Sequence, residues 1–330
     1  MRIRQFDTED ATKALDLWNS TLEQEKSGAR WYVDETRLTN EGLNRIISDL
    51  NHDPEGTFVA CEGSEIVGYG RGVVKTAKSF EEDDLESLPG FLEGLVVSPT
   101  HRRRGIGTAL YRQIEDYVRR RGKREVHVVR ARSAVAGLNV LPDTPEHAFL
   151  LAIGFQEGWR SIRLELGFRD FELRDEILEL RESLRQAGID VLYYEDRFRD
   201  SFGALMEAHF RNWWFGSYRP NLEREAPLPV LIAVDTSQNR VVGFTGFVRV
   251  GSGGRAGFSP GVDPAYRGRG IGKVLANLWA TDVKQQGAVE SVIGTGVNNT
   301  PAKSVYFGMG YRQTAEFFTK LVKPLGTTVS

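Results

Sequence analysis

The chain has 330 residues, enough for about two domains of ~150 residues each. Its 40% hydrophobic and 27% charged residues fit a globular protein, and a formal net charge of −2 argues against a general nucleic-acid binder. The only cysteine, Cys61, excludes an intramolecular disulfide, and the five histidines lack metal-ligand spacing. No apolar run approaches the ~20 residues of a membrane span, and the N-terminus lacks the apolar stretch of a signal peptide. We therefore expect a cytoplasmic protein without metal, membrane or nucleic-acid partner.

The first half of the chain is predicted to contain most of a β-sheet. Alternating or apolar segments predict strands at 2–5, 57–62, 65–75, 91–97, 124–130 and 160–167. The acidic stretch 81–86 is interpreted as a loop before the fourth of these strands, and Cys61 as a small buried residue. Residues 169–187 predict a charged amphipathic helix that opens the second half. The predicted domains are therefore 1–168 and 169–330.

A repeat relates the two halves. The stretch Val97–Gly107 recurs, 165 residues later, as Val262–Gly272. In each copy fifteen further residues lead to another glycine, Gly122 or Gly287, which predicts two helices of equal length with a glycine after the last turn.

A second pair of similar segments follows both predicted helices. Residues 143–155 align without gaps to residues 299–311 at an offset of 156, so the first copy carries nine extra residues within 131–142. Two motifs in the same order, with one short difference in length, indicate duplication of a whole domain.

The repeated stretch contains Arg-x-x-Gly-x-Gly between a strand and a helix. This order brings backbone N–H groups and the positive end of a helix dipole to one place, where a pyrophosphate can bind. The glycines allow sharp turns and close approach of the main chain. The spacing differs from that of the Rossmann and Walker loops. One copy alone could be an ordinary strand–helix turn, but two copies at matching positions favour phosphate binding.

These residues resemble the GNAT superfamily of acyl-CoA-dependent N-acyltransferases. The family's acyl-CoA loop matches Arg102–Gly107 and Arg267–Gly272, and its later motif matches Asn299, Ala302, Tyr306 and the Gly310-Tyr311 pair. The resemblance implies an α/β (α+β) fold of two tandem domains. Each would have a mixed, mainly antiparallel sheet with helices on both faces and a V-shaped splay between its fourth and fifth strands, where the pantetheine arm pairs with strand four.

The resemblance also implies acetyl-CoA as the acyl donor and no metal. The residues expected to bind it are Val96, Val97, Arg102, Arg103, Arg104, Gly105, Ile106, Gly107 and Thr108 in the first half, and Gly261, Val262, Arg267, Gly268, Arg269, Gly270, Ile271, Gly272, Lys273, Asn299 and Ala302 in the second. His101 and Tyr266, just before the loops, are expected to be exposed.

Acyl transfer to an amine needs an oxyanion donor, an acid for the leaving thiolate and a base. A backbone N–H of strand four can serve the oxyanion. In the family the tyrosine of the later motif commonly protonates the thiolate, and Tyr306 stands there, although it could simply be an aromatic residue packed on the sheet. The first half has Leu150 at the same place, which cannot donate a proton.

A base is harder to assign. Some family members carry a glutamate on strand four nine residues before the loop arginine, and Glu93 matches that position, whereas the second half has Phe258. Glu93 could equally be a solvated strand residue. The acid and the base are thus predicted in different halves, and we favour catalysis in the second, with water or an unidentified carboxylate as base.

The function expected from these features is an N-acetyltransferase that moves an acetyl group from acetyl-CoA to a primary amine by direct transfer. The amine could belong to a small molecule or a peptide, because acceptor contacts are expected from 18–50 and 205–228, which match no motif. The alternative is a non-catalytic acyl-CoA-binding or sensing protein with two degenerate halves. The sequence does not indicate the oligomeric state.

Overall fold

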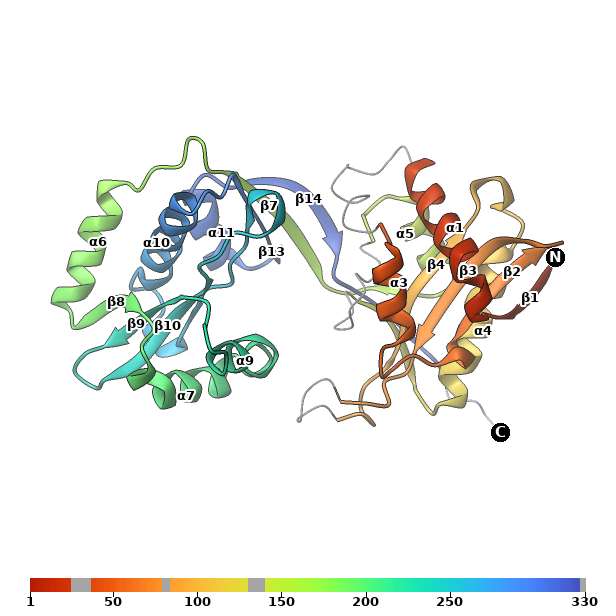
Figure 1. Ribbon diagram of the computed structural model, residues 1–330, viewed down its shortest axis with the longest axis horizontal. Coiled ribbons are helices and arrows are strands. Elements are labelled where there is room, and N and C mark those ends of the chain that lie inside the picture. The colour runs from red at the N-terminus through yellow and green to blue at the C-terminus, as the bar shows by residue number, and fades with distance from the viewer. Residues whose placement is uncertain (25–36, 79–83, 130–139, 327–330) are drawn as a thin grey trace. The chain divides into compact units, whose positions relative to one another are not determined.

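A computed structural model gives the structure of residues 1–24, 37–78, 84–129 and 140–326 (Figure 1). The chain forms two compact units. Unit 1 comprises Met1–Ser161 and Glu316–Ser330, and unit 2 comprises Ile162–Ala315. Residues 81–83 of the acidic stretch 81–86 and residues 131–139 of the segment 131–142, both identified in the sequence, lie outside the described residues.

The sheet of unit 1 has seven strands in the order β1-β2-β3-β4-β5-β15-β6. Neighbouring strands pair antiparallel except β4 and β5, which are parallel. The mixed, mainly antiparallel sheet is thereby confirmed. Its strands are β1 (Arg2–Gln5), β2 (Thr57–Glu62), β3 (Glu65–Val73), β4 (Gly90–Val97), β5 (Glu125–Val129), β6 (Gln156–Glu157) and β15 (Lys320–Pro324).

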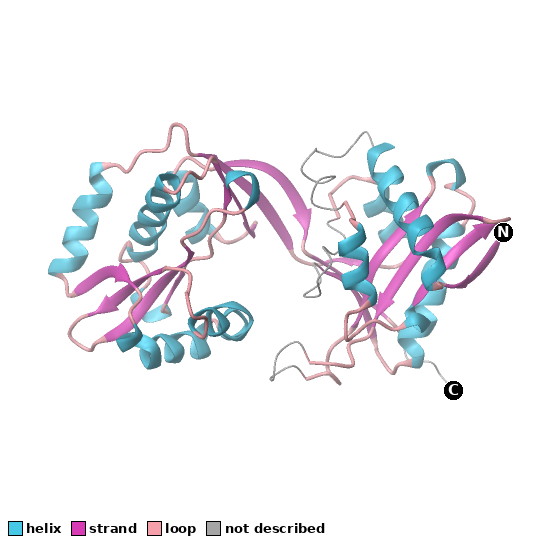
Figure 2. Ribbon diagram, in the orientation of Figure 1, coloured by secondary structure: helices cyan, strands magenta, loops and turns pink. Residues whose placement is uncertain are grey.

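Helices cover both faces of this sheet (Figure 2). Alternate residues of β2 enter different cores: Val59 packs with Trp18 of α1, whereas Phe58 and Ala60 pack with Leu110 of α4. This alternation is the period of two that a strand buried on both faces requires. The helices of unit 1 are α1 (Ala11–Gln24), α3 (Asn40–Ile47), α4 (Ile106–Arg120) and α5 (Pro145–Ala152).

The C-terminal strand β15 belongs to the sheet of unit 1. It pairs with β5 over five residue pairs, from Lys320 opposite Val129 to Pro324 opposite Glu125, and its Leu321 is fully buried. The compact units are therefore not the two contiguous stretches 1–168 and 169–330. The division into 1–168 and 169–330 remains a prediction of where the two duplicated domains begin and end in the sequence.

Unit 2 holds two four-stranded sheets, ordered β12-β10-β9-β8 and β11-β13-β7-β14. The short strands β11 (Arg255–Ala256) and β12 (Gly261–Val262) are the two ends of strand four, and each pairs with a different sheet. The other strands are β7 (Arg160–Gly167), β8 (Ile189–Tyr193), β9 (Val230–Asp235), β10 (Arg240–Phe247), β13 (Glu290–Gly296) and β14 (Arg312–Phe318); β7 and β14 each continue across a boundary between the units.

The helices of unit 2 fall into two groups: the first and the last two pack around Trp279, which is completely buried, and the others pack in a second core around Phe202 and Phe244. They are α6 (Asp175–Gln186), α7 (Arg199–His209), α8 (Arg211–Trp213), α9 (Arg219–Leu222), α10 (Ile271–Gln285) and α11 (Thr300–Gly308). The predicted helix at 169–187 starts only at Asp175. The two repeat helices are α4 and α10, with fifteen residues each, and Gly122 and Gly287 have the positive φ of +77° and +90° that favours glycine there.

Candidate active site

The repeated loops adopt the same backbone conformation in both units. The second and fourth loop residues have positive φ: +63° at Arg103 and +78° at Gly105 in unit 1, and +79° at Gly268 and +87° at Gly270 in unit 2. The fourth residue is the N-cap of α4 or α10 and, being glycine, gives no side-chain cap to the first N–H groups of the helix. When residues with positive φ alternate with residues with negative φ, successive backbone N–H groups point to the same side. Together with the helix dipole, these N–H groups form an anion-binding concavity. Both loops therefore fit a pyrophosphate.

The first arginine of each loop holds the loop to the end of strand four. Arg102 Nε donates to the Val97 carbonyl at 3.2 Å, and Arg267 Nε donates to the Val262 carbonyl at 3.1 Å. The same bond occurs in both units. We therefore infer that it helps to give the two loops their shared backbone conformation. Arg104 lies 4.0 Å from Glu62, an exposed pair that leaves its guanidinium available to a ligand.

The residue before each loop is more buried than the sequence suggested. The exposed fraction of Tyr266 is only 7%, and its hydroxyl donates to Asp235 Oδ2 at 2.7 Å while the Arg269 guanidinium lies over its ring. His101 is half-buried, with Nε2 3.0 Å from Glu62 Oε2. The expectation of exposed side chains was wrong, because each one links the loop to the end of another strand of the same sheet, β2 for His101 and β9 for Tyr266.

Strand four of unit 1 separates from strand five after its first residues. The pairs between β4 and β5 are Gly90 with Val126 and Phe91 with His127, and no further pair is found in the described part of these strands. Along the rest of β4 the side facing β5 is thus open. This is the splay that the sequence resemblance implied.

The hydrogen bonds to β3 determine which amides face the splay. Ser98 N–H donates to the Val67 carbonyl at 2.9 Å, and the antiparallel register then continues with Val97 opposite Gly68 and Val96 opposite Tyr69. Since hydrogen-bonded and non-hydrogen-bonded pairs alternate, Val96 directs its backbone toward β3. Val97 and Leu95 direct their N–H and C=O groups toward the splay.

The same rule applies in unit 2, with one chemical difference. Asp263 N–H donates to the Val242 carbonyl at 2.9 Å, and Gly261 lies opposite Phe244 in the register. Val262 therefore occupies a splay-facing position, and the same alternation continued one residue before β12 places the backbone of Pro260 on that side as well. Proline has no N–H, so strand four of unit 2 lacks the donor that Leu95 provides in unit 1.

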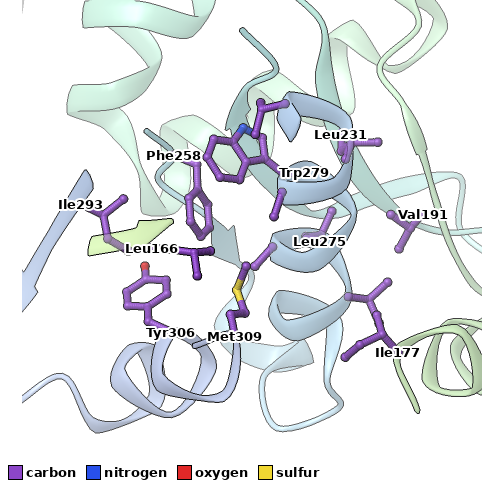
Figure 3. Close-up of a cluster of buried hydrophobic side chains, with 14 of the residues drawn as sticks. Leu166, Ile177, Val191, Leu231, Phe258, Leu275, Trp279, Ile293, Tyr306 and Met309 are labelled. Carbon is purple, nitrogen blue, oxygen red and sulfur yellow. The ribbon is translucent and has the colours of Figure 1, made fainter. Parts of the chain in front are cut away.

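Tyr306 projects from α11 toward the strands of unit 2, beside Phe258 of strand four (Figure 3). Its ring meets that of Phe258 edge-on at 5.7 Å between centroids, and Phe258 stacks on Trp279 at 4.4 Å. In Figure 3 the hydroxyl points toward Leu166 and Ile293 of the neighbouring strands. Only 6% of Tyr306 is exposed, and burial raises the pKa of its phenol to about 12. No hydrogen bond of this hydroxyl is found within the described residues.

The other motif residues of α11 shape the start of the helix. Asn299 Oδ1 accepts from the Ala302 N–H at 3.3 Å, and Asn299 Nδ2 donates to Thr295 Oγ1 at 3.0 Å. These bonds account for the asparagine without a ligand, whereas Ala302 contributes only its backbone N–H; acyl-CoA binding by Asn299 and Ala302 stays a prediction. In unit 1, Leu150 of α5 is buried in the core beneath the sheet.

Glu93, the candidate base, forms a buried ion pair. Its Oε2 lies 3.2 Å from Arg71 Nε, and the side chains are 3% and 4% exposed. Arg71 Nη1 also lies 3.4 Å from the Ile46 carbonyl and 3.5 Å from His52 Nδ1. Protonation of Glu93 would break this ion pair, which disfavours a role as base. The assignment of Glu93 as a base stays a prediction.

The structure brings part of the predicted site together. Within unit 2, loop 267–272 follows the end of strand four and Tyr306 packs against Phe258 of that strand, whereas Glu93 belongs to unit 1. Phe258 belongs to the core that contains α10, and Leu92 belongs to the core that contains α4. In packing, Phe258 therefore corresponds to Leu92 and not to Glu93. Sequence reasoning missed Arg71 and Pro260. The proline was visible in the sequence, but its meaning depends on which way its backbone faces.

Comparison with known proteins agrees with the fold and the loops. The family model described as "Acetyltransferase (GNAT) family" matches residues 15–155 and 191–311. The chain is 26% identical over 267 residues to the mycothiol acetyltransferase of Kocuria rhizophila, covering 77% of this chain and 80% of that protein.

Two solved structures are similar over nearly the whole chain. A GCN5-related glucosamine N-acetyltransferase region of a fungal multi-domain GH3 β-N-acetylglucosaminidase has a TM-score of 0.69 at 16% identity, and the match covers 97% of this chain and 38% of that longer one. A tandem GNAT protein from the clavulanic acid biosynthesis pathway has a TM-score of 0.58 at 18% identity and covers 99% of both chains. At these identities the similarity shows the fold alone.

The two loops, the splayed strands and the repeated architecture define a tandem acyltransferase fold. The chain belongs to the GNAT acetyltransferase family, and both of its halves match the family model. Within the described residues, no cluster of three or more His, Cys, Asp or Glu could hold a metal, and no helix is long and apolar enough to cross a bilayer.

Proposed function

We propose that the protein is an N-acetyltransferase that moves the acetyl group of acetyl-CoA to a primary amine, with the transfer taking place in unit 2. The observation that carries this proposal is the position of Tyr306. Tyr306 is a buried residue whose ring packs against Phe258 of strand four and whose hydroxyl has no hydrogen bond among the described residues, in the unit whose phosphate loop begins where strand four ends. Unit 1 has the loop and the splay, but it has the aliphatic Leu150 in place of the tyrosine.

The chemistry requires little more than positioning and a proton donor. The loop would hold the pyrophosphate, the open edge of strand four would pair with the pantetheine arm, and the thioester would lie beside Tyr306. The amine attacks the thioester carbon within one ternary complex, and the departing sulfur takes a proton from Tyr306. Water or an unidentified carboxylate removes the extra proton of the amine. Cys61 lies in β2 of unit 1, so no acyl-cysteine intermediate is proposed.

The acceptor is proposed only as a class, a small molecule or peptide with a primary amine. The names of similar proteins, a mycothiol acetyltransferase and a glucosamine N-acetyltransferase region, suggest sugar-linked amines as the first compounds to test.

A second candidate function is acyl-CoA binding without transfer. The buried Arg71–Glu93 pair favours it for unit 1, because it places an ion pair where some family members carry a catalytic carboxylate. In this view unit 1 binds acyl-CoA only, and the question is whether unit 2 does the same.

Thiol release from acetyl-CoA, measured with a panel of amino sugars, polyamines and peptides, tests the proposal. Gly272→Glu and Gly107→Glu are matched variants. Neither glycine has positive φ, and an added Cβ would lie 3.7 Å from Val262 or 3.3 Å from Phe149. A carboxylate there suits the helix start but repels a phosphate. Gly272→Glu should abolish turnover, and Gly107→Glu should leave it. No amine-dependent release by the wild-type protein would favour the binding-only function.

A further inference from the structure

The two units differ in which element near the splay carries a hydrogen-bond donor, strand four or the helix that follows strand five. In unit 1 the strand offers the Leu95 amide, and the helix that follows strand five carries Leu150. In unit 2 the strand has Pro260, which has no N–H, and the corresponding helix carries Tyr306. Strand four keeps the amide of Val97 or Val262 in both units, and the donor that differs is the Leu95 amide in the first unit and the Tyr306 phenol in the second.

The Tyr306 hydroxyl is in a position to replace the missing amide. Its ring contacts that of Phe258, two residues before Pro260 on strand four, and its hydroxyl points toward Ile293 of strand five and Leu166 of β7. The last pair between strands four and five is Ala256 with Ser291, so Phe258 and Ile293 lie just beyond the point where the two strands separate. The neighbouring Tyr311 differs, because its hydroxyl donates to Ser291 Oγ at 2.7 Å. Tyr306 has no such bond among the described residues, which leaves its proton for a ligand.

Building on the proposed transferase function, we propose that the Tyr306 hydroxyl binds the carbonyl oxygen of the thioester in unit 2, the task for which Pro260 leaves no amide. Tyr306 therefore acts before the sulfur departs as well as when it departs. A thioester carbonyl is the chemical group that this donor recognises. Acyl-CoA esters satisfy that requirement, whereas free CoA does not.

The electrons balance without another reactant. The nitrogen lone pair of the amine forms the C–N bond, and the carbonyl π pair moves onto oxygen, where the hydroxyl stabilises the negative charge by a hydrogen bond. The pair then returns, the C–S bond breaks, and the sulfur takes a proton from the hydroxyl. The proton lost by the amine passes through water and restores the hydroxyl. The products are an amide and free CoA.

The acidity of the phenol fits this role. Burial raises the pKa of Tyr306 to about 12, so the hydroxyl keeps its proton near neutral pH and remains a donor throughout the attack.

Binding of unreactive analogues tests the proposal without turnover. The probes are S-acetonyl-CoA, a ketone that keeps a carbonyl oxygen, and S-propyl-CoA, which has none. The protein is the full chain with Gly107→Glu, so that calorimetry reports unit 2. Tyr306→Phe should weaken the ketone analogue about three- to tenfold, the effect of one hydrogen bond, and change S-propyl-CoA less than twofold. Tyr311→Phe, the matched control, should not separate the two analogues.

The possible failures are distinguishable. Equal effects of Tyr306→Phe on both analogues overturn the inference, even if the protein acetylates amines. A selective effect on the ketone supports it, even if no amine in the panel is acetylated and the transferase proposal fails. If the Gly107→Glu chain binds neither analogue, the inference and the proposed second site are both wrong.

If an acceptor is found, restoring the amide gives a kinetic test. Loss of one oxyanion donor typically costs about 10²–10³-fold in kcat, so Tyr306→Phe should fall in that range. Pro260→Ala in the Tyr306→Phe protein gives strand four an N–H and should recover at least tenfold, with Pro260→Ala alone as the reference. A double variant as slow as Tyr306→Phe that still binds the ketone analogue overturns the proposal.

Discussion

Replacing Glu93 by glutamine should destabilise unit 1 strongly. The ion pair with Arg71 is 3–4% exposed, and removing one partner of such a pair usually costs about 3–5 kcal/mol because a charge stays buried without compensation. The remaining neighbours of the guanidinium include the Ile46 carbonyl and His52, whose pKa is lowered by its burial and by Arg71 itself. Neither of them carries a negative charge. Since the amide of glutamine can still accept a hydrogen bond, we expect about 3 kcal/mol.

Urea unfolding followed by a probe in unit 1 measures this loss. Glu41→Gln is the matched control, because its pair with Arg45 lies on the same unit, is 83% and 57% exposed at 3.7 Å, and should contribute less than about 0.5 kcal/mol. The double variant Arg71→Met/Glu93→Leu removes both charges and should recover most of the stability. If Glu93→Gln costs less than about 1 kcal/mol, the reasoning from burial is wrong. If it abolishes turnover without loss of stability, Glu93 is a catalytic base.

Two further predictions concern ligand binding and pH. Calorimetry should find two acyl-CoA molecules per wild-type chain and one in either Gly107→Glu or Gly272→Glu; a wild-type value of one would mean that one loop no longer binds. The pKa of Tyr306, raised to about 12, predicts that its deprotonation does not lower kcat below pH 10, because the protonated phenol is the active form. An alkaline decline centred near pH 8 that disappears in a Tyr306→Phe protein with residual activity would contradict this.

The local parts of the site could be predicted from the sequence. The Arg-x-x-Gly-x-Gly loops were identified from their residue spacing. The glycines were expected where the chain turns sharply, and Gly105 and Gly270 do have positive φ in the structure. The strand–loop–helix order places the loop at the end of strand four without information from elsewhere in the chain. Finding the motif twice was decisive, since neither copy is specific by itself.

Other parts of the site depend on contacts between distant residues. Arg71 and Glu93 lie on adjacent strands, and their pairing becomes visible only when the register of β3 and β4 and the irregularity near Glu93 are known. Pro260 looks like an ordinary proline in the sequence, and only the register of β10 and β12, continued by one residue, assigns its backbone to the splay side. A shift of one residue would have turned it toward β10. Sequence periodicity alone does not determine such a register.

The C-terminal strand is a further long-range feature, because residues 320–324 carry no sign of their partner β5, about 190 residues earlier. A chain that ends at Thr319 would lack β15, and with it the buried Leu321 and Leu325 and the ion pair of Lys323 with Glu115. Each buried leucine typically contributes about 2–5 kcal/mol, so the loss approaches the whole stability of a domain, about 5–15 kcal/mol.

We therefore expect this truncation to unfold unit 1 and spare unit 2. Limited proteolysis should cut readily within residues 1–161, while Ile162–Ala315 stays resistant and keeps its acyl-CoA site in calorimetry. The matched control ends at Gly326 and retains all of β15, so it should behave as the full chain does. Equal resistance of unit 1 in both truncated proteins would show that its sheet is stable without the strand. In that case β15 contributes little to the stability of unit 1. Residues 1–168 would then be a better definition of the first folding unit than the compact unit that includes residues 316–330.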